Sequence, residues 1–145
     1  YGPRVVRFGI DPDRLILARA RRPADLLWMM EEGLRSKALA VVIGEGVSAD
    51  LTASRRLQLA AEAGTTAALL LPPLAARSST ALTRWRVASA PSGDGPFRPR
   101  WRIALERCRG GSPADWLLEW DDATSCFCVV PPLADRRPPL AAALG

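Results

Sequence analysis

The chain has 145 residues, of which 48% are hydrophobic and 24% charged, a balance typical of a globular domain with one hydrophobic core. It contains no histidine, which excludes a Ser-His-Asp triad and most catalytic zinc sites, and no apolar run approaches the roughly 20 residues that span a bilayer. The net charge of +5 fits a nucleic-acid partner but does not require one.

The cysteines indicate the cellular compartment of the protein, and the first residue indicates whether the chain is complete. Three cysteines, an odd number with no secretory leader, indicate a reducing compartment, so we expect a cytoplasmic protein with no membrane partner. Cys126 and Cys128 share one strand face without a further ligand cluster, so we expect buried, reduced thiols and no metal. The chain begins at Tyr1 and its only methionines are Met29 and Met30, so we expect a fragment or a processed product.

The chain opens with a turn, a strand and a helix. Residues 9–14 predict the turn, and Leu15–Arg19 predicts a short buried strand. Pro23 suits the first turn of a helix with apolar residues at helical spacing, which Ser36 and Lys37 close. Residues 39–43 are apolar without alternation, which predicts a strand covered on both faces.

A second helix and strand follow. Asp50 or Thr52 can cap a helix over residues 53–63, and Gly64 ends it. Residues 66–71 predict another apolar strand. Three strands alternating with two helices predict a parallel sheet with right-handed crossovers.

The second half of the chain repeats a short Arg-Trp-Arg phrase, at 83–87 and again at 99–103. With a third segment at 116–122, it predicts an antiparallel meander with strands near 82–89, 100–107, 115–121 and 125–130. The fold class is therefore α/β with a mixed sheet. Residues 131–145 are rich in Pro and Ala and predict a disordered tail after a domain over 1–130.

Alternation along these strands separates the aromatic residues from the arginines. We expect four tryptophans to form a structural core on the inner face: Trp85, Trp101, Trp116 and Trp120. The arginines then lie on the outer face and pair across strands with Glu119 and Asp121. The alternative, arginines tracking a nucleic-acid backbone while tryptophans stack on bases, needs both residue types on one face.

Two places could contact a ligand or a partner. Glu45 follows an apolar strand, where a parallel sheet places ligand-facing residues, and it is read either as a metal- or water-directed carboxylate or as a solvated loop residue. Arg55, Arg56 and Gln58 lie on the outer side of the second helix and suit contact with a phosphate or a partner, or else form a solvated face in which Arg55 or Gln58 bonds to Glu62. The sequence has no phosphate-binding glycine loop, so we expect no catalytic residues and no cofactor here.

The order of segments resembles the second half of a RecA-type ATPase core: residues 9–15 resemble its Gly-Val-Asp-Pro turn, and 38–43 its Walker B strand. Several phrases resemble the ImuA family, the RecA- and SulA-like accessory proteins of bacterial SOS mutagenesis. These phrases are Leu26-Leu27-Trp28 with Glu31-Glu32, residues 51–62, residues 83–87, residues 107–111 and residues 116–121. The resemblance covers about residues 9–130.

The resemblance implies a non-catalytic role in damage-induced translesion DNA synthesis. The implied partners are an ImuB-type polymerase homologue, RecA and an error-prone C-family polymerase, with DNA and a second copy of the chain as further candidates. Gly44 stands where the Walker B strand of RecA ends in aspartate, and the two RecA DNA-binding loops correspond to 46–50 and 72–81. Two alternatives are a DNA-stimulated ATPase, with ATP bound by the full-length protein, and a SulA-like inhibitor of cell division.

Overall fold

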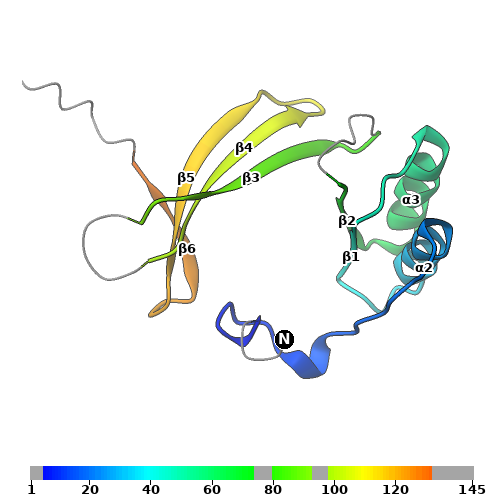
Figure 1. Cartoon of the computed structure of the whole chain (residues 1–145). Helices are drawn as coiled ribbons and strands as arrows, with labels where there is room; N and C mark the ends of the chain where they lie inside the picture. The colour runs from blue at the N-terminus through cyan, green and yellow to red at the C-terminus, as the bar shows by residue number, and fades with distance from the viewer. Residues whose placement is uncertain (1–4, 74–79, 93–97, 132–145) are drawn as a thin grey trace, which may run out of the picture. The chain divides into compact units, whose positions relative to one another are not determined.

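The chain folds into two compact units, Ile16–Leu82 and Tyr1–Leu15 with Thr83–Gly145. The computed structural model describes residues 5–73, 80–92 and 98–131 (Figure 1). The predicted tail lies outside these residues except for Pro131. Each unit has its own sheet and its own packing, so the two are taken in turn.

The first unit is a layer of two helices on a two-stranded parallel sheet. Its elements in chain order are α2 (Pro23–Arg35), β1 (Val41–Glu45), α3 (Leu51–Gly64) and β2 (Ala67–Leu71). In the register of the sheet, Val41 lies opposite Ala67 and Glu45 opposite Leu71. Pro23 begins α2 as predicted, and Asp50 caps α3 by accepting a hydrogen bond of 2.7 Å from the amide of Ala53.

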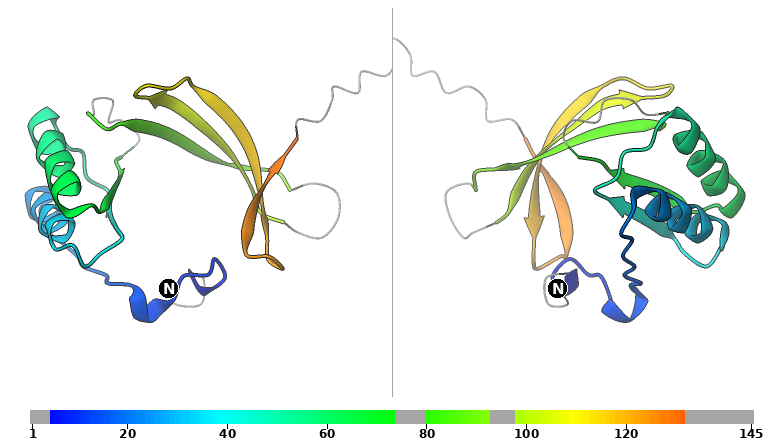
Figure 2. Two further views of the ribbon diagram at one scale, coloured as in Figure 1. Left: turned by 180° about the vertical axis from the view of Figure 1, so that it is seen from behind. Right: turned by 45° about the vertical axis from the view of Figure 1, so that its right-hand side comes forward.

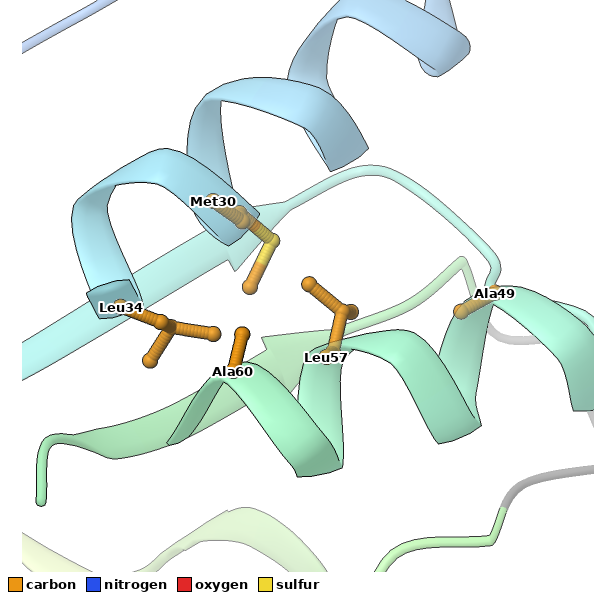
Figure 3. Packing of buried hydrophobic residues seen from close by; sticks show 5 residues of the cluster. All are labelled: Met30, Leu34, Ala49, Leu57 and Ala60. Carbon is orange, nitrogen blue, oxygen red and sulfur yellow. The ribbon is translucent and has the colours of Figure 1, made fainter. Parts of the chain in front are cut away.

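The core of this unit lies where α2 and α3 meet the sheet (Figure 3). Its buried members are Met30, Leu34, Ala49, Leu57 and Ala60. Met30 and Leu34 are four residues apart on α2, and Leu57 and Ala60 are three apart on α3, so each helix presents one apolar stripe to the other and to the strands. Ala49 joins them from the loop before α3. Full burial of a side chain such as Leu34, which is 0% exposed, contributes roughly 1.5–3 kcal/mol.

Gly64 does not end α3 in the way that the sequence predicts. The residue in the left-handed conformation is Thr65, with φ of 56°, and Gly64 is the last helical residue. A Cβ at Gly64 would lie 1.7 Å from the carbonyl oxygen of Leu34. Glycine is therefore needed here for the close approach of α3 to the end of α2, and not for a positive φ.

Two expectations for this unit are wrong. Leu15–Arg19 is not a buried strand: Ile16 and Leu17 are 76% and 78% exposed, and the parallel sheet has two strands in the described residues. Nor is β1 covered on both faces, because Ile43 is 56% exposed. The helices pack on one face only, so an apolar run indicated a strand but not the number of layers around it.

The second unit is the predicted antiparallel meander (Figure 2). Its strands are β3 (Thr83–Ala90), β4 (Arg100–Cys108), β5 (Ala114–Asp121) and β6 (Cys126–Val130), paired in that order. Arg84 lies opposite Arg107 and Trp85 opposite Leu105, so β4 has an extra residue between these pairs. Strict alternation of side chains along Arg-Trp-Arg explains why the sequence predicted these strands within one or two residues.

An aromatic cluster closes one end of this sheet. Phe8, from the start of the chain, makes an edge-to-face contact with Trp120 at 4.9 Å, and Phe127 makes a similar contact with Trp120 at 4.9 Å. Both rings also contact Trp101. Arg7 anchors the same segment through two hydrogen bonds, of 2.8 and 2.6 Å, to the carboxylate of Asp122. Such aromatic pairs add about 0.5–1.5 kcal/mol each beyond their buried area.

Candidate interaction surfaces

The outer face of α3 carries a short row of hydrogen-bonded polar side chains. Arg55 donates to the side-chain oxygen of Gln58 at 3.1 Å, and Gln58 donates to Glu62 at 2.9 Å. This matches one of the two readings of the sequence, a hydrogen-bonded helix face. Arg55 is exposed on that face, so the row presents a guanidinium at the surface without burying it.

Arg56 is placed differently, because it joins the two helices. Its guanidinium pairs with Glu31 of α2 at 2.5 Å, and Arg35 pairs with the other oxygen of the same carboxylate. The Glu31 side chain is 6% exposed, whereas that of Arg56 is 60% exposed. Two cations therefore compensate one buried carboxylate, and Arg56 has a structural task beside any contact it makes with a partner.

Glu45 lies at the carboxyl end of β1, as predicted. The backbone turns directly after it at Gly46, whose φ is 76° and whose amide donates to the carbonyl of Leu71. Among the described residues, no hydrogen bond or ion pair joins Glu45 to the arginines of α3. The structure thus leaves Glu45 as an exposed carboxylate and does not unite the predicted residues into one site.

The charged face of the antiparallel sheet is held by ion pairs. Arg100 and Arg98 both pair with Glu119, and Arg86 pairs with Glu106 at 2.9 Å. The hydrogen bond from Arg100 is the main reason that the pKa of Glu119 lies below its ordinary value. The predicted pairing of arginines with Glu119 is confirmed. The carboxylate of Asp121 instead accepts the amide of Ala123.

The tryptophan face is only partly buried, which corrects the prediction of a four-tryptophan core. Trp120 is 3% exposed, Trp101 and Trp116 are half-buried, and Trp85 is 49% exposed. Burial falls with distance from Phe8, which covers the Trp120 end of the sheet. The predicted alternation of side chains is confirmed, but alternation does not indicate whether a second layer covers the apolar face.

The cysteines are also less buried than expected. Cys126 and Cys128 are exposed free thiols on β6, and Cys108 is half-buried. In the register of the sheet the two exposed thiols lie opposite Asp121 and Glu119, so they belong to the charged face. No group of cysteine and acidic side chains in the described ranges could hold a metal ion, and no helix there could cross a bilayer.

Two features of the structure could not be predicted from the sequence. Nothing in the sequence around Glu31 indicates burial, and only the approach of α3 makes it a buried partner for two arginines. Phe8 precedes the first predicted strand, and nothing local signals its contact with Trp120, which is more than 100 positions away along the sequence. Both depend on contacts between distant segments.

The fold indicates the class of protein, and similarity to known sequences indicates the family. The parallel helix-covered strands and the antiparallel meander form an α/β fold consistent with part of a RecA-like core. No protein-family model matches the chain. Two curated relatives, both named Protein ImuA, come from two strains of Caulobacter vibrioides, NA1000 and ATCC 19089. Each is 38% identical over 155 aligned positions, which cover 94% of this chain and 64% of the relative. This likeness supports an assignment to the ImuA family, and the chain spans less than two thirds of the length of these relatives.

Proposed function

We propose that the full-length protein is a non-catalytic accessory factor of DNA-damage-induced mutagenesis. The observation that carries this proposal is the 38% identity over 94% of the chain to ImuA of Caulobacter vibrioides. The ImuA family, on the resemblance described above, implies SOS-induced translesion synthesis through contacts with an ImuB-type polymerase homologue, RecA and an error-prone C-family polymerase.

The outer face of α3 supports the proposal as a contact surface. Arg55 is exposed and oriented by Gln58, and the row ends on the carboxylate of Glu62. A guanidinium oriented by an amide oxygen on an exposed helix can pair with acidic side chains or phosphates of a partner while the helix stays intact. Exposed Leu59, at 48%, adds an apolar contact to the same helix.

The test is a pull-down in which the immobilised full-length protein is incubated with the purified ImuB-type homologue or with RecA, and the retained partner is measured. Arg55→Glu is expected to weaken retention of at least one partner by tenfold or more, since charge reversal at a contact costs more than the roughly 1.4 kcal/mol that a factor of ten represents. Arg21→Glu is the matched control, an exposed arginine of the same unit before α2. Retention of neither partner by the unaltered full-length protein would refute the proposed function itself.

A second candidate function is a DNA-stimulated ATPase in which this chain supplies half of the nucleotide site. The position of Glu45 at the carboxyl end of a parallel strand favours it, because α/β sheets place ligands at that edge. Equilibrium binding of a fluorescent ATP analogue to the full-length protein, with and without single-stranded DNA, tests this function. Absence of binding in both conditions would rule it out.

A further inference from the structure

The antiparallel sheet carries an apolar groove on its tryptophan face. Side chains from all four strands line it: Trp85, Val87, Ile103, Trp116, Leu118 and Val129. Its volume is about 470 Å³, and the ring centroids of two lining residues, Trp85 and Trp116, lie 6.0 Å apart. Every lining side chain is apolar, so the groove suits a hydrophobic occupant and offers nothing to orient a charged ligand.

The side chains that line the groove are more exposed than is usual for the apolar face of an antiparallel sheet. Val87 and Val129 are 59% and 62% exposed, although both lie in strands that are paired with a neighbouring strand. An antiparallel sheet normally packs its apolar face on a second layer, and within the unit that contains this sheet no second layer covers the described side chains of the groove.

A cover for this face begins at the neighbouring end. Phe8 packs on Trp120, and Arg7 binds the Asp122 carboxylate beside it. On β5, Leu118 of the groove is two residues from Trp120, on the same face of the strand. The groove is therefore a direct continuation of a surface that another segment of the protein already covers.

We propose that an amphipathic helix of the full-length protein, from sequence that this chain does not contain, packs in the groove and completes the cover begun by Phe8. The chain spans 64% of the length of its relatives, so enough further sequence exists in them for such a layer. Four strands span about 14 Å at 4.8 Å spacing, and one helix with side chains is about 10–12 Å wide. A single helix therefore fits the groove. This inference does not depend on the proposed function.

Thiol labelling tests the proposal. In a background with Cys108, Cys126 and Cys128 changed to serine, Val87→Cys places a thiol in the groove. Ala88→Cys, the matched control, places one on the opposite face of β3, at a residue that is also exposed. Each variant is made in this chain and in the full-length protein, and each is labelled with a maleimide under native conditions.

In this chain, both thiols are expected to react at similar rates. In the full-length protein, the Val87→Cys thiol is expected to react at least about tenfold more slowly while the Ala88→Cys thiol is unchanged. Equal rates for the two positions in the full-length protein, whether both fast or both slow, would overturn the proposal. Protection of Val87→Cys already in this chain would also overturn it, and would assign the groove to a second copy if the protection rises with concentration, or to the chain itself if it does not.

Discussion

Glu31 shows how one buried carboxylate can organise two helices. It receives Arg35 from its own helix and Arg56 from α3, and its side chain is 6% exposed. We expect Glu31→Gln to lower the free energy of unfolding by about 1–3 kcal/mol, because it leaves two guanidinium groups facing a neutral amide. Arg56→Gln should cost less than about 1 kcal/mol, since that side chain is mostly exposed and Glu31 keeps Arg35. Urea unfolding measures both, and a larger loss for Arg56→Gln would contradict this asymmetry.

Glu119 makes the stability of the antiparallel sheet depend on acid. Its pKa is lowered in the folded protein, mainly by the hydrogen bond from Arg100. A lowered folded-state pKa means that the ion pairs stabilise fully above the unfolded-state pKa and are lost as pH falls towards the folded-state pKa. We expect Glu119→Gln to lower the thermal midpoint at pH 7, and the gap from the unaltered chain to close between roughly pH 5 and pH 3. A gap that stays constant across this range would show that packing, and not charge, is what the substitution changes.

At the scale of elements, the contact between α2 and α3 depends on the absence of a side chain. A Cβ at Gly64 would meet the backbone oxygen of Leu34 at 1.7 Å, whereas one at Gly44 would meet the flexible end of Met30, with its sulfur at 2.1 Å. Gly44→Ala should cost about 1–3 kcal/mol, because Met30 can change rotamer. Gly64→Ala should cost more, because one helix must move. Chemical denaturation of the two variants checks this order, and equal costs would contradict it.

Helices and strands could be predicted where apolar residues recur at a regular spacing along a short stretch of sequence. The meander was found because Arg-Trp-Arg alternates, and α2 because apolar residues recur at helical spacing from Pro23. The prediction of a strand at Leu15–Arg19 was wrong because a short apolar run carries no local signal that another strand pairs with it. In the described residues, no strand does so. The partners of Arg56 and of Trp120 could not be predicted, since their contacts cross 25 and more than 100 positions of sequence.

At the scale of the whole molecule, the chain has two cores built on different principles. Ile16–Leu82 buries aliphatic side chains between helices and a parallel sheet, while the other unit packs aromatic rings on one end of an antiparallel sheet. Separate cores allow separate local unfolding. Gly64→Ala is therefore expected to speed amide hydrogen exchange in α2, α3 and β1, roughly tenfold or more for a loss above about 1.4 kcal/mol, without changing β4 and β5. Mass spectrometry of peptides from both units measures this, with Glu119→Gln as the reciprocal variant that should deprotect β4 and β5 alone. If either substitution speeds exchange equally in both units, the two cores unfold as one, and the sheet and the helical layer are energetically coupled in the chain as it stands.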